Sequence, residues 1–208
     1  MIKGACLDFD GTLVDTKDIL FNAWKKALSE NNIKFDEEDL RNRILKQTYV
    51  DIIRAYNPGA SREEIEKIRD YRSKLVRNKI KNNILFPETI EFLSRLKQIE
   101  IKVAIGSNMS RELLEFMIEK IGISKFIDAI VSADDVKRGK PAPDIFEKAF
   151  ELLGISPKEG AVVGDTENDI IAGNEIGAFT IFISRKGEKL PYAKANVSNL
   201  LDALKYMH

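Results

Sequence analysis

The sequence contains very few of the residues on which many catalytic and structural sites depend. Its 208 residues include one cysteine, Cys6, and one histidine, His208. A single cysteine excludes an internal disulfide and is typical of a reducing compartment, so we expect Cys6 to be a small buried packing residue. A single histidine leaves no credible histidine-based catalytic triad or zinc site.

Long apolar runs and an excess of one charge are also missing. No segment approaches the length of about 18 apolar residues that indicates a membrane span, and the N-terminus lacks a secretory signal pattern. Lysine and arginine total 33, as do aspartate and glutamate, so no charge bias points to nucleic acid. We therefore expect a cytoplasmic protein, monomeric or homodimeric, whose partners include neither nucleic acid nor membrane.

Strand-like and helical segments alternate over most of the chain. Strand-like runs occur at residues 3–9, 101–106, 129–131, 161–164 and 180–183, with a weaker one at 195–197. Helical patterns cover residues 89–97, 111–120 and 145–153, and a last helix is expected from Asn199. This alternation predicts an α/β fold in which helices cover both faces of a parallel sheet.

The first connection departs from this rhythm. Between residues 14 and 85 we find only helical patterns: one at 18–30, one starting near Asp36, one containing Ile52 and Ile53, and one starting at Ser61. Ser61 and Glu64 match a capping box. Because a crossover normally needs only about a dozen residues, we predict that residues 15–84 form a helical cap domain inserted into a core of residues 1–14 and 85–208.

The two predicted parts differ in charge. Residues 15–84 hold 16 lysines and arginines and 12 acids, a net of +4, which leaves −4 for the rest of the chain. A basic insertion facing an acidic site would attract an anionic substrate. The lysines and arginines could equally be the solvated faces of the helices.

Three acids follow predicted strands at two separate places. Asp8 and Asp10 come at the end of the first strand, and Asp165 follows the strand at 161–164. Side chains two positions apart on a strand point to the same side, so Asp8 and Asp10 can share one face. Acids at the carboxyl edge of an open sheet repel each other unless a cation joins them, and oxygen ligands of this kind suit Mg²⁺.

Four motifs together resemble those of the haloacid dehalogenase superfamily, in its phosphatase branch. They are Asp8-Phe9-Asp10-Gly11-Thr12, Ser107-Asn108, Lys140-Pro141-Ala142-Pro143-Asp144, and the segment from Gly164 to Asp169. Each motif alone is weak, but four in this order beside the expected elements make a specific signal. The resemblance implies a Rossmann-like sheet ordered 3-2-1-4-5 with an α-helical cap inserted after the first motif.

The resemblance also implies a mechanism. Asp8 attacks phosphorus and forms an aspartyl-phosphate, while Asp10 protonates the leaving oxygen and later takes a proton from water. Thr12 orients Asp10. Mg²⁺ is held by Asp8, by the backbone carbonyl of Asp10 and by Asp165, with support from Asp169.

Phosphate-binding roles follow for Thr12, Ser107, Asn108 and Lys140, with Ser107 and Lys140 also counted as catalytic. Ser107 donates a hydrogen bond to a phosphoryl oxygen, and Lys140 places positive charge beside Asp8. Plainer roles remain open. Ser107 could cap the helix at 111–120, and Asp169 could be an acid favoured near a helix N-terminus. Asn108 could be purely structural.

The sequence thus predicts a hydrolase, a Mg²⁺-dependent phosphatase of a small phosphorylated metabolite such as phosphoglycolate or a sugar phosphate. One alternative is a sugar-phosphate mutase of the β-phosphoglucomutase type. Those mutases often carry a histidine where this chain has Leu20, and residues 46–50 lack their Gly-x-x-Arg element. Another alternative is a non-catalytic binding module, which would usually have lost a motif acid, and none is lost here.

Overall fold

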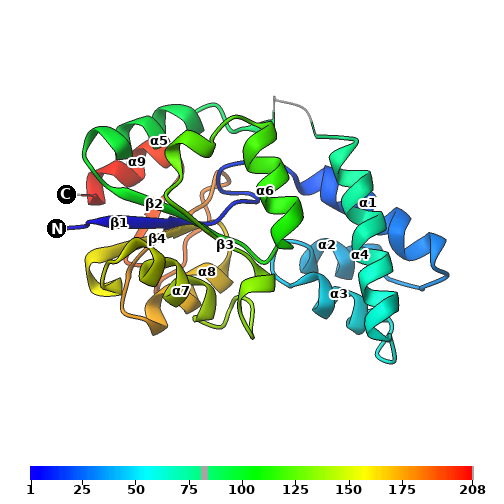
Figure 1. Cartoon of the computed structure of the whole chain (residues 1–208). Coiled ribbons are helices and arrows are strands. Elements are labelled where there is room, and N and C mark those ends of the chain that lie inside the picture. The colour runs from blue at the N-terminus through cyan, green and yellow to red at the C-terminus, as the bar shows by residue number, and fades with distance from the viewer. Residues whose placement is uncertain (81–83, 208) are drawn as a thin grey trace.

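The computed structural model describes residues 1–80 and 84–207, in which six parallel strands form one sheet in the order β3-β2-β1-β4-β5-β6 (Figure 1). The strands are β1 (Gly4–Leu7), β2 (Lys102–Gly106), β3 (Ala129–Val131), β4 (Gly160–Gly164), β5 (Phe179–Ile183) and β6 (Ala195–Val197). The predicted order of the first five strands is confirmed. The weak strand predicted at 195–197 is β6, which extends the sheet beyond β5.

Helices cover both faces of this sheet, as expected for parallel strands. Figure 1 shows α5 (Thr89–Gln98), α6 (Arg111–Lys120) and α9 (Leu200–Ala203) on one side, and α7 (Asp144–Leu153) and α8 (Glu167–Glu175) on the other. Along β1, Ala5 and Leu7 pack into the first hydrophobic cluster, whereas Cys6 packs into the second, against α7. Cys6 is fully buried, as predicted.

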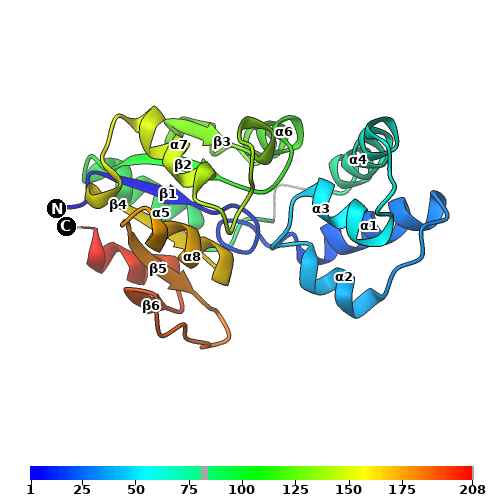
Figure 2. The same ribbon diagram turned by 90° about the horizontal axis from the view of Figure 1, so that it is seen from below.

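Four further helices lie to one side of the sheet, as the view from below shows (Figure 2). They are α1 (Lys17–Glu30), α2 (Glu37–Arg43), α3 (Tyr49–Tyr56) and α4 (Arg62–Arg77). Their apolar faces form a hydrophobic cluster of their own, which includes Trp24, Leu40 and Ile65. The predicted capping box of Ser61 and Glu64 begins α4. These helices therefore bury a cluster of their own, while Leu20, Ala23 and Val76 on α1 and α4 pack into the first cluster on the sheet.

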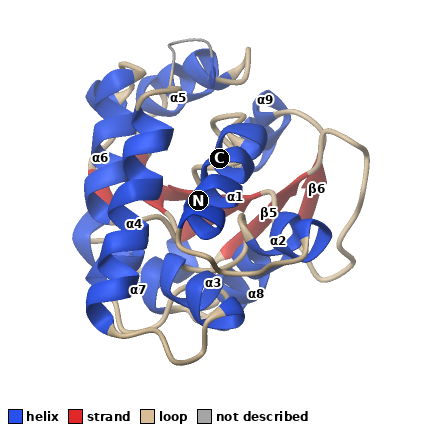
Figure 3. Ribbon diagram, turned by 90° about the vertical axis from the view of Figure 1, so that its right-hand side faces the viewer, coloured by secondary structure: helices blue, strands red, loops and turns tan. Residues whose placement is uncertain are grey.

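The chain leaves the sheet and returns to it at neighbouring points. The Asp15 N–H donates to the Ile84 carbonyl at 2.7 Å, and the Phe86 N–H donates to the Leu13 carbonyl at 3.1 Å. Figure 3 shows α1–α4 in front of the sheet when the molecule is seen from their side. Residues 81–83 of the predicted insertion, and His208, lie outside the described residues. None of the described helices is long and apolar enough to span a membrane.

Candidate active site

Three neighbouring strand ends bring the predicted motifs together. Because β1 lies between β2 and β4, with Leu7 level with Ile105 and Val163, the residues that follow these strands meet at one edge. The turn after β1 requires a glycine. Gly11 has a φ of +83°, and a Cβ there would lie 2.2 Å from Oδ2 of Asp165. Because Gly11 has no side chain, the loop after β1 can approach Asp165 at the end of β4.

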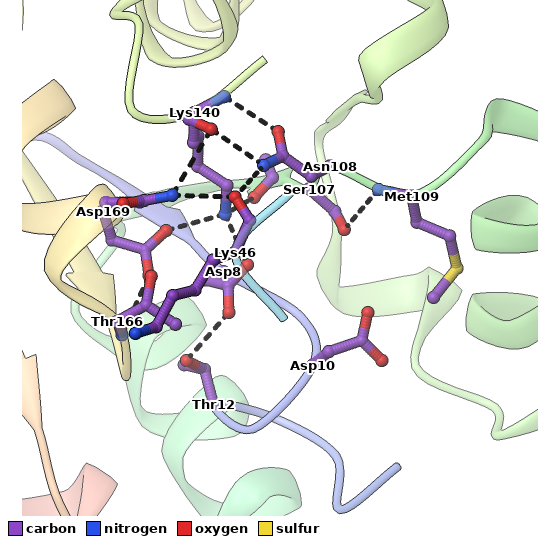
Figure 4. A network of polar contacts seen from close by, with 12 residues as sticks. Asp8, Asp10, Thr12, Lys46, Ser107, Asn108, Met109, Lys140, Thr166 and Asp169 are labelled. Carbon is purple, nitrogen blue, oxygen red and sulfur yellow. Dashed lines mark hydrogen bonds and ion pairs between the residues drawn. The ribbon is translucent and has the colours of Figure 1, made fainter. Parts of the chain in front are cut away.

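Lys140 is the centre of the polar network at this edge (Figure 4). Its ammonium donates to Asp8 Oδ1 at 2.5 Å, to Asp169 Oδ1 at 2.7 Å and to the Gly106 carbonyl at 3.0 Å. Burial by itself would lower the pKa of Lys140, but the charges of Asp169 and Asp8 outweigh it and hold the pKa above its ordinary value. A buried cation is thus satisfied by three oxygens, and the prediction that Lys140 lies beside Asp8 is confirmed.

Asp169 serves the helix and the site at once. Its Oδ2 accepts hydrogen bonds from the Thr166 hydroxyl at 2.6 Å and from the Thr166 N–H at 3.1 Å, which form the capping box of α8. Its Oδ1 faces Lys140. The role of a helix N-terminal acid therefore holds for one oxygen, while the other belongs to the site network.

The acids at this edge have the composition of a divalent-cation site. Asp8, Asp165 and Asp169 each offer a carboxylate oxygen, and these oxygens lie within 4.8 Å of one another. Oδ1 of Asp165 is buried and has no hydrogen-bond donor among the described residues. Burial raises the pKa of Asp165 to about 7, and the charge of Asp169 adds to the effect. An unpartnered acidic oxygen beside two other carboxylates fits Mg²⁺, which prefers such oxygen ligands.

Asp10 lies apart from this network (Figure 4), although both Asp8 and Asp10 line the same cavity. The expectation that Thr12 orients Asp10 is wrong. The Thr12 hydroxyl donates to Asp8 Oδ2 at 3.2 Å, and Thr16 donates to Asp10 Oδ1 at 2.5 Å. The strand ends at Leu7, so the turn that follows sends the two carboxylates to different partners. The turn at residues 11–13 brings Thr16 back beside Asp10, a position that an extended strand would not give it.

Burial also raises the pKa of Asp10. The hydrogen bond from Thr16 and the positive charge of Arg72 oppose this rise without cancelling it. A carboxyl group whose pKa lies above the ordinary range holds a proton at higher pH, and this property suits a general acid.

Ser107 and Asn108 follow β2 and face the network from the other side. The Met109 N–H donates to Ser107 Oγ at 3.1 Å, and α6 begins after Ser110, so Ser107 does not cap that helix. The Asn108 amide joins two segments: its Nδ2 donates to the Lys46 carbonyl at 2.9 Å, and its Oδ1 accepts from the Lys140 N–H at 2.8 Å. Asn108 therefore has a structural role in tying the inserted helices to the third motif.

The inserted helices complete the walls of the cavity. Asn168 donates to the same Lys46 carbonyl at 2.7 Å, and the Tyr49 hydroxyl donates to Asp134 at 2.9 Å. Leu20 and Trp24 line the cavity from α1, and Arg72 lines it from α4. Trp24 is buried in the helical cluster, as predicted.

Sequence reasoning did not identify Thr16, Lys46, Arg72 or Asn168. Only Arg72 left a signal in the sequence. It follows Ile65 and Ile68 at helical spacing and precedes Val76, so a charged residue stands on an apolar stripe.

Comparisons with known proteins match this geometry. The family model described as haloacid dehalogenase-like hydrolase matches residues 6–183. The chain is 27% identical over 194 residues to the pyrophosphatase PpaX of Oceanobacillus iheyensis, which covers 93% of this chain and 89% of the relative. It is 30% identical over 183 residues to a phosphoglycolate phosphatase of Aquifex aeolicus. This match covers 83% of this chain and 80% of the relative.

The fold is similar to that of known crystal structures. The structure of β-phosphoglucomutase from Clostridium difficile superimposes with a TM-score of 0.86 at 23% identity, covering 100% of this chain and 96% of that one. At this level of identity the likeness concerns the fold alone.

Proposed function

The chain belongs to the haloacid dehalogenase-like hydrolases, and from this premise we propose that it is a Mg²⁺-dependent phosphatase of a small phosphorylated metabolite. The observation that carries the proposal is the grouping of Asp8, Asp165 and Asp169 beside the ammonium of Lys140. A nucleophilic carboxylate, further acids for a cation and a fixed positive charge are the parts that phosphoryl transfer needs.

Asp8 is the nucleophile in this proposal. One of its carboxylate oxygens forms a bond to phosphorus while the bond from phosphorus to the leaving oxygen breaks, which gives an aspartyl-phosphate. Water then attacks phosphorus, the bond to Asp8 breaks, and inorganic phosphate is released. Lys140 and Thr12 hold the Asp8 carboxylate in place through the hydrogen bonds described above.

Asp10 is the general acid and base. It gives its proton to the leaving oxygen in the first step and takes one from the attacking water in the second, so it ends the cycle as it began. Its raised pKa favours the protonated form that the first step requires, and Thr16 fixes its orientation. Asp10 and Asp8 both line the cavity, which supports the assignment of both to one reaction centre.

Asp8, Asp165 and Asp169 would hold Mg²⁺ through side chains, and Asp10 through its backbone carbonyl. When bound, the ion supplies positive charge that offsets the repulsion between the nucleophile and the phosphoryl oxygens. Ser107 would donate a hydrogen bond to one of those oxygens, and Lys140 would contribute its positive charge beside Asp8, since its three ammonium hydrogens already donate to Asp8, Asp169 and Gly106. Asn108 would hold the loop after β2 in place, because both hydrogens of its amide donate to the Lys46 and Lys140 carbonyls. The Ser107 hydroxyl accepts one bond from Met109 and still has a hydrogen to donate.

Residues 15–84 would act as a cap domain over this centre. Their contacts to the core through Lys46 and Tyr49 support a closed form that excludes water from the reaction. A closed cap favours small substrates over macromolecules. The names of the relatives, pyrophosphatase and phosphoglycolate phosphatase, support a compact phosphorylated substrate.

A sugar-phosphate mutase is the second candidate, because the fold is so similar to that of a β-phosphoglucomutase. Leu20 weighs against it. This side chain lines the cavity where such mutases often carry a histidine, and it cannot relay a proton. Phosphorus NMR of a sugar phosphate incubated with the protein separates the two: hydrolysis releases inorganic phosphate, whereas a mutase interconverts isomers without releasing it.

Turnover of p-nitrophenyl phosphate with and without Mg²⁺ tests the proposal. We expect metal-dependent hydrolysis that falls by at least about 10⁴-fold in Asp8→Asn, because the amide is not a nucleophile. Asp18→Asn is the matched control, since the Asp18 side chain is 86% exposed on α1. Turnover in Asp8→Asn equal to that of the control would refute the mechanism, and an inactive wild-type protein would favour a binding module.

A further inference from the structure

Arg72 is a buried charge on the inserted helices. It follows Ile65 and Ile68 on the buried face of α4, and only 3% of its surface is exposed. Arginine is almost never buried to this extent unless it is paired. Arg72 therefore does not belong to the solvated face of α4, and its burial needs another explanation.

The charge of Asp10 compensates that of Arg72 only in part, because it raises the pKa of the guanidinium but burial outweighs it. Nε of Arg72 is buried and has no hydrogen-bond acceptor among residues 1–80 and 84–207. The guanidinium carbon lies 5.0 Å from the centre of the Trp24 ring, a cation–π contact that stabilises the charge without using its donors. Burial lowers the pKa of Arg72 to about 10, so the side chain is still a cation at neutral pH. A desolvated cation with an unused donor is destabilising until an anion binds it.

The location of Arg72 indicates which anion that is. Arg72 lines the same cavity as Asp8, Asp10 and Ser107. On the core side, the transferring phosphoryl group already has the positive charge of Lys140 and the Ser107 hydroxyl of the loop after β2. Arg72 comes from the insertion, and so it suits a group at the other end of the substrate.

We propose that Arg72 binds a second anionic group of the substrate, one that is distinct from the transferred phosphoryl group. This inference rests on the proposed phosphatase function. Two kinds of compound meet the requirement: inorganic pyrophosphate, in which the second group is a phosphate, and 2-phosphoglycolate, in which it is a carboxylate. Guanidinium forms paired hydrogen bonds with either group.

Steady-state kinetics on three substrates test this role. Pyrophosphate and 2-phosphoglycolate carry the second anion, whereas 2-hydroxyethyl phosphate has the length of phosphoglycolate and a neutral end. We expect the wild-type protein to prefer at least one of the two anionic substrates over the neutral one by at least about tenfold in kcat/KM. The faster of the two identifies the second group.

Arg72→Gln should remove this preference selectively. We expect kcat/KM for the preferred substrate to fall roughly 100-fold, mainly through KM, because a hydrogen-bonded ion pair is lost. Turnover of hydroxyethyl phosphate should fall by a smaller factor than that of the preferred substrate, because this compound has no second anion to lose and only the effect of the Arg72 charge on Asp10 remains. Arg72→Lys should recover part of the preference, since it keeps the charge without the paired donors. Lys74→Gln, an exposed change on the same helix, is the control.

The outcomes separate the two proposals. Equal losses on all three substrates in Arg72→Gln would overturn the specificity role, because either a structural role or contact with the transferred phosphoryl group predicts that result. If Arg72→Gln fails to fold, Arg72→Lys replaces it in the test. A partial loss of the preference for the anionic substrate then supports the specificity role, and equal losses on all three substrates overturn it. Wild-type turnover without preference rejects the role of Arg72 and leaves the phosphatase intact, whereas no turnover of any substrate rejects the phosphatase itself.

Discussion

The sheet edge and the inserted helices each bury a positive charge, but the two charges differ in how many hydrogen-bond partners the protein gives them. At the sheet edge, Lys140 donates to two carboxylates and a carbonyl, all from the core. In the insertion, Arg72 stacks against Trp24 and leaves its Nε without an acceptor among the described residues. The core therefore carries a pre-formed network for a reaction common to many substrates. The insertion carries an incomplete contact, which a particular substrate would complete.

The difference follows from how each region is built. Parallel strands end side by side, so loops far apart in sequence supply several charges of both signs to one place. A helix face presents residues three and four positions apart, and the neighbours of Arg72 on that face are apolar. Burying a charge costs free energy in both regions. At the sheet edge, protein oxygens stabilise the buried cation, whereas in the insertion we expect a ligand to do so.

The largest stability effect is expected from removing the cation of the core. Lys140→Met would leave Asp8 and Asp169 buried without their shared partner, and we expect the free energy of unfolding in urea to fall by about 3 kcal/mol. Added Mg²⁺ should restore part of the loss, because a second cation then faces these acids. Lys137→Met, an exposed change nearby, should stay within about 0.5 kcal/mol of wild type. If Lys140→Met is as stable as wild type, the ion pairs of Lys140 with Asp8 and Asp169 do not stabilise the fold, and the prediction is contradicted.

Removing the charge of Asp165, whose Oδ1 has no partner among the described residues, should weaken metal binding. In Asp165→Asn we expect the Mg²⁺ concentration for half-maximal turnover to rise roughly 100-fold, because an anionic ligand becomes a neutral amide. Glu167→Gln alters an acid in the same segment whose side chain bonds Tyr192 instead, and it serves as the control. An Asp165→Asn titration that overlays the control would rule out Asp165 as a ligand.

A structural acid of the core should show the opposite pH behaviour from the site acids. Burial would raise the pKa of Asp135, but hydrogen bonds from Ser132 and Arg111 outweigh it, and the pKa is lowered. A lowered folded-state pKa means that Asp135 stabilises the fold above the unfolded-state pKa of about 4 and that this contribution is lost as the pH falls further.

Unfolding of Asp135→Asn at several pH values measures this contribution. We expect a deficit of about 1.5 kcal/mol at pH 7 that shrinks below about pH 4. The exposed change Asp202→Asn should give a small difference at every pH. A constant Asp135→Asn deficit down to pH 2 would contradict the ionic contribution.

The smallest effect is expected within the insertion. Ser61→Ala removes the side-chain acceptor of the α4 capping box, and we expect the free energy of unfolding to fall by about 1 kcal/mol. Hydrogen exchange should quicken in the first turn of α4 and stay unchanged in β1, since the first turns of α4 pack through Ile65 and Ile68 in the helical cluster, whereas β1 packs in the clusters on the sheet. Ser29→Ala, exposed near the end of α1, is the control. Faster exchange in β1 as well would show that the two regions open together.

Much of the fold could be predicted from local patterns. The alternation of apolar runs with helical stripes placed β2, β3 and α6 to within a residue, because burial imposes different periods on strands and helices. The strand predicted at residues 3–9 was too long, since Phe9 is as apolar as the strand but belongs to the turn. The range of helix α8 was not predicted, and only the interpretation of Asp169 as an acid near a helix N-terminus implied a helix there. Its sequence mixes polar and apolar residues without a clear stripe, and its position is set by packing on β4 and β5.

The sequence by itself determined the kind of fold, because helices and strands impose different periods on apolar residues. The resemblance carried by four motifs in order implied the strand order and the acids that gather at one edge. Only the tertiary structure decided which partner each group has. Thr12 bonds Asp8, Thr16 bonds Asp10, and Arg72 lines the cavity across from the core acids. The physical reason is that hydrogen bonds form over a few ångströms, and the turns and helix contacts that set such distances involve residues far apart in the chain.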